Sequence, residues 1–435
     1  RSIILLLNKP EGVMKMHDFI LHGNVVYSKN KDELILIENG YVVCKNGICE
    51  GAYDVLPEEY KDFEIAELGD KVIIPGFTDL HVHAPQYTFR SVGMDCELLD
   101  WLNLHAFPEE AKYSDIDYAK KAYKLFVEDI KTGYTTRACI FGTLHKESTL
   151  YLMSLLENSG LKTMVGKVNM DRNSPDYLCE ESAEKSIEQT IEFIESAKQF
   201  KNTRPIVTPR FIPSCTDKLM YGLSEIIKKY NLAVQSHLSE NPSEIEWVKA
   251  LCPDSTSYGN AYEQFGMMSD KTIMAHCVHM TDEELCIMKE RGVFAAHCPE
   301  SNMNLASGIS PAARMLDEGI KVGLGSDVAG GTTLSIPRAM VLAIQCSKLY
   351  WRYINNSLKP LNLENVFYMA TKVGGEFFGM SGSFEKGYEF DALVIDDEKI
   401  RTTIDFTLKE RIERIIYLGD KSNLVSKYVA GNKIF

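Results

Sequence analysis

Two histidines separated by a single residue, His81 and His83, follow an apolar stretch and could bind one metal ion together. In an extended segment, residues two apart point to the same side of the chain. Taken alone, the pair fits equally well with two unrelated histidines near the end of a strand. The interpretation as a metal site therefore depends on further ligands elsewhere in the chain.

Three such candidates, His237, His276 and Asp327, each follow a short apolar run. If those runs are strands of one α/β barrel, the side chains meet at its C-terminal face, where barrel enzymes have their active sites. Imidazole nitrogen and carboxylate oxygen suit zinc and also iron. We predict one Zn²⁺ per chain, with Fe²⁺ as the alternative, held by three of these histidines and Asp327.

Such a ligand set suits hydrolysis, because three histidines and one aspartate leave a coordination position for water. The ion lowers the pKa of that water toward about 7, which makes hydroxide available at neutral pH. Glu240 lies three residues after His237 and could face the same pocket. A carboxylate there can carry a proton from the water to a leaving group. Without a neighbouring ligand, Glu240 would be interpreted as a solvated surface acid.

The other histidines have simpler interpretations. His297 ends a further apolar run and could line the pocket. His279 is expected to be structural. The remaining ones are expected to be surface or packing residues: His17, His22, His105 and His145.

The middle of the chain alternates between strand-like and helical segments. The pattern Ile116–Ile130 has helical spacing, with Ser114 as the expected N-cap and Gly133 at its end, and Ile187–Ala197 carries a second apolar stripe. Eight βα units over roughly 250 residues indicate an α/β fold of the (β/α)8, TIM-barrel type. The eight expected strands are Val72–Ile74, Tyr134–Ile140, Lys162–Val168, Pro205–Phe211, Leu232–Ser236, Thr272–Ala275, Val293–Ala296 and Lys321–Leu324.

Both ends of the chain are rich in strand and turn signals. We expect the terminal segments to form one small β domain from residues 16–74 and 385–435, with the barrel spanning residues 75–384. The expected terminal strands are Phe19–Tyr27, Glu33–Glu38, Gly40–Val43, Asp391–Ile395, Ile412–Leu418 and Val429–Ile434.

Composition excludes several classes of function. A net charge of −14 opposes binding to a phosphate backbone, so no nucleic-acid partner is expected. The apolar run Ile3–Leu7 is too short for a membrane span or a secretory signal, and Met14 is a candidate start. The eleven scattered cysteines include no CxxC pair and are interpreted as reduced thiols of a cytoplasmic protein.

Several motifs carry a resemblance to a known family. The segment Pro75–His83 resembles the opening motif of the amidohydrolase superfamily, and later motifs are similar to those of its guanine deaminase family. These are Ala84-Pro85-Gln86-Tyr87, Leu98-Leu99-Asp100-Trp101-Leu102 with Phe107-Pro108-Glu109, Thr208-Pro209-Arg210-Phe211, Ser236–Asn241, His297-Cys298-Pro299 with Ser301-Asn302, and Gly323–Gly331. Glu300 departs from the pattern, since relatives usually have a smaller polar residue there.

The resemblance implies a distorted barrel with a β-sandwich built from both termini, and often a homodimer. It implies that His81, His83, His237 and Asp327 bind the zinc. It also implies that Glu240 shuttles protons, that His276 orients the hydroxide, and that Asp327 acts in catalysis as well as in metal binding. Guanine, a small purine base, would be converted to xanthine and ammonia. The residues implied to contact it are Gln86, Arg210, Phe211, His237 and Glu240.

Three alternatives remain at this stage. Another single-metal aminohydrolase could act on triazines, adenosine derivatives or cytosine. A two-metal cyclic-amide hydrolase would need a lysine at the end of the fourth strand, where Thr208–Phe211 has none. A catalytically inactive scaffold would be expected to have lost ligands, whereas every ligand and Glu240 are present.

Overall fold

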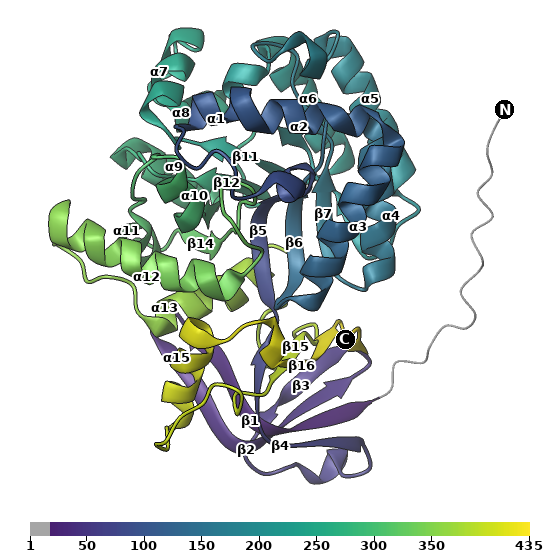
Figure 1. Ribbon diagram of the computed structural model, residues 1–435, viewed down its shortest axis with the longest axis vertical. Helices are drawn as coiled ribbons and strands as arrows, with labels where there is room; N and C mark the ends of the chain where they lie inside the picture. The colour runs from purple at the N-terminus through teal and green to yellow at the C-terminus, as the bar shows by residue number, and fades with distance from the viewer. Residues whose placement is uncertain (1–17) are drawn as a thin grey trace.

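A barrel of parallel strands lies above a smaller β domain in the computed structural model, which describes residues 18–435 (Figure 1). Helices surround the barrel strands, and segments from both ends of the chain meet in the lower domain. The run Ile3–Leu7, the candidate start at Met14 and His17 fall outside the described residues.

The barrel strands form two parallel four-stranded sheets in the order β5-β6-β7-β9 and β11-β12-β13-β14. The expected third and fourth strands are each interrupted, and a short separate pair, β8 and β10, lies beside them. A single bridge from Val207 to Val234 connects the halves there, so the barrel is distorted as expected. The bounds are β5 (Phe77–His83), β6 (Thr135–Phe141), β7 (Lys162–Gly166), β8 (Val168–Asn169), β9 (Thr203–Pro205), β10 (Thr208–Pro209), β11 (Val234–Leu238), β12 (Thr272–His276), β13 (Phe294–His297) and β14 (Lys321–Leu324).

The prediction of the first barrel strand was wrong. The run Val72–Ile74 belongs to β4 (Glu64–Pro75) of the β domain, where Val72 pairs with Asn24 and Ile74 pairs with Leu393. The first barrel strand is the next segment, Phe77–His83, which is fully buried and carries both histidines of the HxH pair. A short apolar run does not indicate which of two sheets it joins, because both bury it equally well.

The helices cover the outside of the barrel. The expected helix at 116–130 is α3 (Ile116–Thr132), but its N-cap is Asp115 and not Ser114, because the Asp115 carboxylate accepts from the amides of Asp117 and Tyr118. The expected stripe at 187–197 lies on α5 (Ala183–Ala197). The others are α1 (Leu98–Trp101), α2 (Phe107–Ala111), α4 (Lys146–Ser159), α6 (Asp217–Tyr230), α7 (Pro242–Leu251), α8 (Tyr258–Gln264), α9 (Asp282–Arg291), α10 (Pro299–Asn304), α11 (Ala312–Asp317), α12 (Ile336–Tyr353), α13 (Leu363–Tyr368), α14 (Gly374–Glu376) and α15 (Leu408–Leu418).

The terminal segments form one β domain, as expected. Among the described residues its strands join in a sheet of order β17-β16-β15-β4-β1-β2-β3. The remaining bounds are β1 (Phe19–Asn30), β2 (Glu33–Lys45), β3 (Ile48–Tyr53), β15 (Ala392–Ile395), β16 (Leu424–Val429) and β17 (Asn432–Lys433). The last expected strand, Val429–Ile434, is instead the turn between β16 and β17 together with its flanks.

The strand expected at Ile412–Leu418 is wrong, because this segment belongs to helix α15. Thr407 and Glu410 form a capping box at its start. Leu408, Ile412 and Ile415 are buried, at intervals of three and four residues that place them on one helical face.

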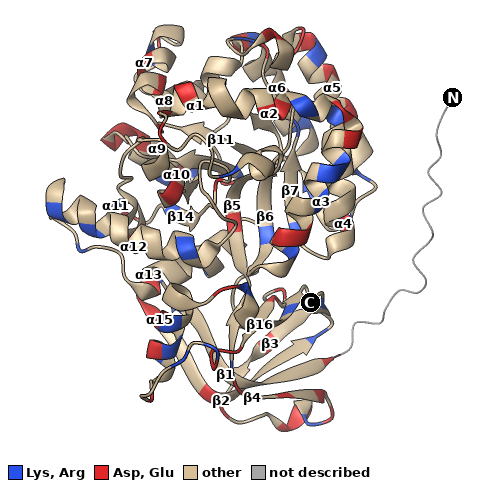
Figure 2. Ribbon diagram, viewed as in Figure 1, with Lys and Arg blue, Asp and Glu red and all other residues tan. Residues whose placement is uncertain are grey.

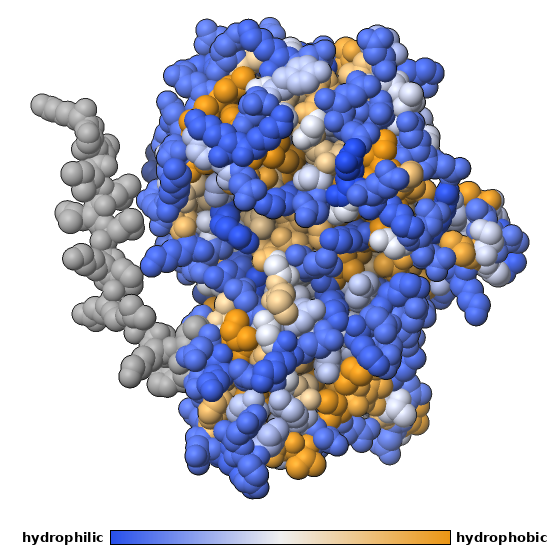
Figure 3. Space-filling view, turned by 180° about the vertical axis from the view of Figure 1, so that it is seen from behind, coloured by the Kyte–Doolittle hydropathy of each residue, from blue (hydrophilic) through white to orange (hydrophobic). Residues whose placement is uncertain are grey.

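The outer surface of the helices is polar. Lys and Arg lie between Asp and Glu along the outer helices (Figure 2), and the face seen from behind is mostly hydrophilic (Figure 3). Within residues 18–435, none of the helices combines the length and apolar character needed to cross a membrane. All eleven cysteines lie in this part of the chain and are free thiols.

A buried ion pair connects the barrel to the β domain. Arg137 on β6 donates to both carboxylate oxygens of Asp391, at 2.7 and 2.9 Å, and to Glu389 at 2.7 Å. We expect Arg137→Met to lower the free energy of unfolding by about 3–5 kcal/mol, because Asp391 would remain buried without a counter-charge. Urea unfolding measures this, with Lys185→Met at an exposed pair as the control. Equal effects of the two variants would contradict a structural role for the Arg137 pair.

Candidate metal centre and active site

The HxH pair lies on the last residues of β5 with both side chains buried. The Nε2 atoms of His81 and His83 are 3.2 Å apart. Residues two apart on a strand share a face, so the local geometry brings both imidazoles to the inside of the barrel. The side chains of His81 and His83 therefore converge, as their spacing in the sequence predicted.

His237 and Asp327 reach the same point from other strands. Nε2 of His237, on β11, lies 3.3 Å from Nε2 of His83. Oδ1 of Asp327, which follows β14, lies 3.0 Å from Nε2 of His81 and 3.4 Å from Nε2 of His83. Nδ1 of His237 donates to the backbone carbonyl of Arg210 at 2.6 Å, which leaves the Nε2 lone pair facing the other ligands.

These distances fit a divalent ion. Neighbouring ligand atoms about 2.0–2.1 Å from one ion lie about 2.9–3.6 Å apart in a four- or five-coordinate site. The four separations above span 3.0 to 3.4 Å. Burial and the neighbouring His81 lower the pKa values of His83 and His237, so both imidazoles are neutral and able to coordinate. Burial would raise the pKa of Asp327, but His81 and His276 outweigh it and keep the carboxylate ionised.

Glu240 and His276 lie beside this group. Oε2 of Glu240 is 3.3 Å from Nε2 of His276, and Nε2 of His276 is 3.7 Å from Oδ2 of Asp327. Asn302 accepts from Nδ1 of His276 at 2.8 Å and so directs its Nε2 into the site. Burial, with Asp327 nearby, raises the pKa of Glu240 to about 8, while a hydrogen bond from Ser307 opposes the shift. A carboxyl group with a pKa near neutrality can both take up and release a proton.

Two site residues have left-handed backbone conformations. His276 has φ of +73° and Asp327 has φ of +46°, a region that residues other than glycine rarely occupy. Such conformations cost on the order of 1–3 kcal/mol and persist only where the surrounding structure imposes them. Both residues lie near a strand end, His276 as the last residue of β12 and Asp327 in the loop that follows β14.

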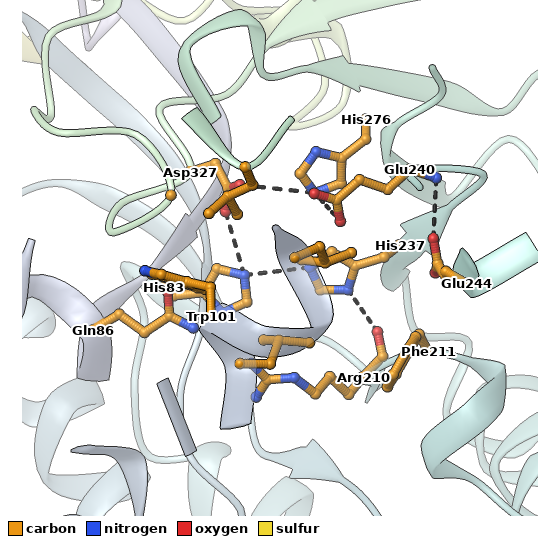
Figure 4. A pocket seen from close by; sticks show the side chains of 14 residues that line it. His83, Gln86, Trp101, Arg210, Phe211, His237, Glu240, Glu244, His276 and Asp327 are labelled. Carbon is orange, nitrogen blue, oxygen red and sulfur yellow. Dashed lines mark hydrogen bonds and ion pairs between the residues drawn. The ribbon is translucent and has the colours of Figure 1, made fainter. Parts of the chain in front are cut away.

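The pocket above this group contains the expected base-contacting residues. Gln86, Arg210 and Phe211 line one pocket together with His83, His237, Asp327, Glu240 and His276. Figure 4 shows these side chains directed at a common space. Leu98 and Trp101 of α1 and Leu102 of the π-helical turn η3 (Leu102–Ala106) also line it.

The structure also shows site residues that sequence reasoning missed. Glu110 on α2 accepts from Arg210 at 2.7 Å and from Gln86 at 2.8 Å. Asp79 accepts from the amides of His81 and Ser326, and so connects β5 to the loop of Asp327. Asp79 lies within the Pro75–His83 motif, which could have identified it, whereas Glu110 follows Phe107-Pro108-Glu109 without a local signal of its own.

Glu244 is a further missed residue, which accepts from the backbone amide of Glu240 at 3.1 Å and lines the pocket. His297 is buried at the end of β13 but does not line the pocket. Glu300 accepts from Thr332 and Arg338, so it connects α10 to the start of α12. His279 donates to the carbonyl of Ser307 in a structural contact.

Comparison with known proteins agrees with this geometry. Residues 72–434 match the Amidohydrolase family. The chain is 41% identical to guanine deaminase of Dictyostelium discoideum over 85% of this chain and 84% of that protein. It is 33% identical to guanine deaminase of Escherichia coli over 92% of each.

A solved structure covers almost the whole chain. The crystal structure of guanine deaminase from C. acetobutylicum, with guanine bound in its active site, superposes with a TM-score of 0.93 at 46% identity. The match includes 96% of this chain and 100% of that one. With the motifs, the site geometry and these matches together, the chain belongs to the amidohydrolase family and, within it, to the guanine deaminases.

Proposed function

We propose that this protein hydrolyses guanine to xanthine and ammonia, with one zinc ion held by His81, His83, His237 and Asp327. The observation that carries the proposal is the placement of Arg210 and Gln86 on the wall of the same pocket that contains the metal group and Glu240. Iron is the alternative ion for this donor set. A divalent ion here would supply Lewis-acid activation of a water molecule.

Proton transfer is assigned to Glu240. The attacking water loses a proton as it adds to the carbon that bears the exocyclic amine, and the amine must gain one to leave as ammonia. Glu240 performs both transfers, because its carboxyl group is buried in the same site and lies 3.3 Å from Nε2 of His276. His276 holds the oxygen of the attacking water, with its ring oriented by Asn302. Oδ2 of Asp327 lies 3.7 Å from Nε2 of His276 and would accept a hydrogen bond from the same water.

Recognition of the base is assigned to the opposite wall. Phe211 supplies an apolar face, and it packs edge-on against Trp247 at a centroid distance of 6.2 Å. Guanine carries a ring carbonyl, an acceptor that adenine lacks, and Arg210 offers fixed donors suited to it. Gln86 offers a donor and an acceptor for a mixed purine edge. His237 and Glu240 complete the contacts near the reacting carbon.

The direct test of the proposal is product analysis. Purified, zinc-loaded protein incubated with guanine should yield xanthine and ammonia in equal amounts, as measured by chromatography and an ammonia assay. Ammonia without xanthine, or no turnover of guanine, would contradict the assignment.

Arg210→Met should lower kcat/KM for guanine by about tenfold to a hundredfold, the value of a hydrogen bond from a charged donor. The metal should stay bound, because only the backbone carbonyl of Arg210 contacts a ligand, His237. Steady-state kinetics and elemental analysis measure both quantities. If kcat/KM for guanine is unchanged, the Arg210 side chain only pairs with Glu110 and does not recognise the base.

The alternative functions require different residues or different substrates at this site. A two-metal hydrolase would place a lysine at the end of the fourth barrel strand, where Arg210 instead pairs with Glu110. Hydrolysis of triazines, adenosine derivatives or cytosine is the alternative prediction for the substrate. Turnover assays with these compounds and with guanine distinguish the two predictions. Assembly as a homodimer and a cytoplasmic location stay predictions.

A further inference from the structure

We propose that Glu110 is a positioning residue that holds Arg210 and Gln86 in the orientation needed to recognise the ring carbonyl of a purine. The inference deepens the proposed function and rests on it. Glu110 would not touch the base. It would act through the two side chains that do, and so determine the preference for oxopurines.

Glu110 joins three segments that are distant in the sequence. One carboxylate oxygen accepts from Nη1 of Arg210 at 2.7 Å, and the other accepts from Nε2 of Gln86 at 2.8 Å. Exposed fractions are 1% for Glu110, 3% for Arg210 and 2% for Gln86. Hydrogen bonds between buried groups are strong and are costly to lose, so this arrangement is well determined.

The carboxylate determines how the Gln86 amide is turned. A carboxylate only accepts, so the NH₂ group of Gln86 must face Glu110. The carbonyl oxygen of Gln86 then faces the backbone amide of Ala329, which donates to it at 3.1 Å. One N–H of Gln86 remains free for a ligand, in a direction set by these two contacts.

The same carboxylate holds one end of the Arg210 guanidinium. The group also lies over the ring of Phe107, 5.0 Å from its centroid, and the remaining N–H groups are available to the pocket. Glu240 and Arg210 line the same pocket, so Glu240 is a second carboxylate on the side of the guanidinium that faces the pocket. Without Glu110, the guanidinium would therefore have a competing partner in the proton-transfer residue.

The neighbouring Glu109 offers a matched control. It lies on the same helix, but its carboxylate accepts from Thr88 at 3.0 Å and from Lys112 at 2.6 Å, away from Arg210 and Gln86. Glu109→Gln thus removes an acidic group from the same turn of α2 and leaves both base-contacting side chains in place.

The test compares Glu110→Gln with Glu109→Gln by calorimetric binding of hypoxanthine and of unsubstituted purine to the zinc-loaded proteins. These two bases differ in the ring carbonyl and the ring proton that accompanies it. We expect Glu110→Gln to weaken hypoxanthine binding by about tenfold to a hundredfold. Purine binding should change by less than about threefold, and Glu109→Gln should change neither. KM for guanine should rise in Glu110→Gln more than kcat falls.

Equal weakening of both bases, or no weakening of hypoxanthine binding, would overturn the inference. So would wild-type protein that binds both bases equally. If Glu110→Gln does not fold, Glu110→Asp, which keeps the charge on a shorter side chain, should show a smaller loss confined to hypoxanthine. Wild-type protein that prefers hypoxanthine but does not deaminate guanine would contradict the proposed function and leave the role of Glu110 standing.

Discussion

Replacement of Glu240 by glutamine is expected to leave the metal bound and to abolish turnover of guanine. Glutamine has nearly the same shape but cannot accept the proton released by the attacking water. General acid–base catalysis is worth about 10²–10⁴-fold, and the loss should be at the upper end because one group serves both proton transfers. Steady-state ammonia release measures the loss, and elemental analysis measures the metal.

Glu246→Gln is the matched control for this variant. Glu246 lies on helix α7, directly after the Glu240 segment, but its side chain is exposed. Its removal should leave kcat/KM within about a factor of two, in line with the small effects of surface substitutions. Retained activity in Glu240→Gln would exclude this residue from proton transfer. Loss of metal in that variant would make its role structural.

Removal of a ligand should also have a large effect. His81→Ala or His237→Ala should lose both the ion and activity, because the remaining three side chains no longer enclose it. Lewis-acid catalysis contributes several kcal/mol, which at 1.36 kcal/mol per tenfold corresponds to about 10³-fold or more in rate. The expected metal content is one equivalent in the unaltered protein and close to none in either variant.

Reversible metal removal and a distant histidine provide the controls. A chelator should abolish activity of the unaltered protein, and added zinc should restore it. His22→Ala should keep both metal and activity, since His22 pairs with Glu67 in the β domain. Two equivalents of tightly bound metal would favour a two-metal hydrolase, and full activity of metal-free protein would exclude the metal mechanism.

Local patterns predicted that the candidate ligand side chains would converge, because their placement follows from short stretches of backbone. The spacing of His81 and His83 determines their common face once the segment is a strand. The barrel topology then brings His237 and Asp327 to the same end. None of this needs knowledge of how side chains pack, so residue types and strand positions were enough.

The wrong predictions concern segments whose secondary structure or sheet is determined by tertiary packing. Val72–Ile74 is apolar enough for either sheet, and only pairing with β1 and β15 assigns it to the β domain. The isoleucines of the segment Ile412–Leu418 favour a strand, but the capping box at Thr407 starts a helix that includes this segment.

Glu110 was missed for a related reason. The π-helical turn Leu102–Ala106 precedes α2 and shifts the helical phase, so periodicity does not show whether Glu109 or Glu110 faces the pocket. The partners of Glu110 are also 24 and 100 residues away in the sequence. Contacts at that separation leave no local pattern.

The most direct test of the central claim is a side-by-side measurement of kcat/KM for ammonia release from guanine, adenine and cytosine by the zinc-loaded protein. Guanine should exceed adenine by about 10⁴-fold or more, because a site built to bind the ring carbonyl leaves its buried polar groups unpaired with adenine. Faster release from adenine or cytosine than from guanine would contradict the account.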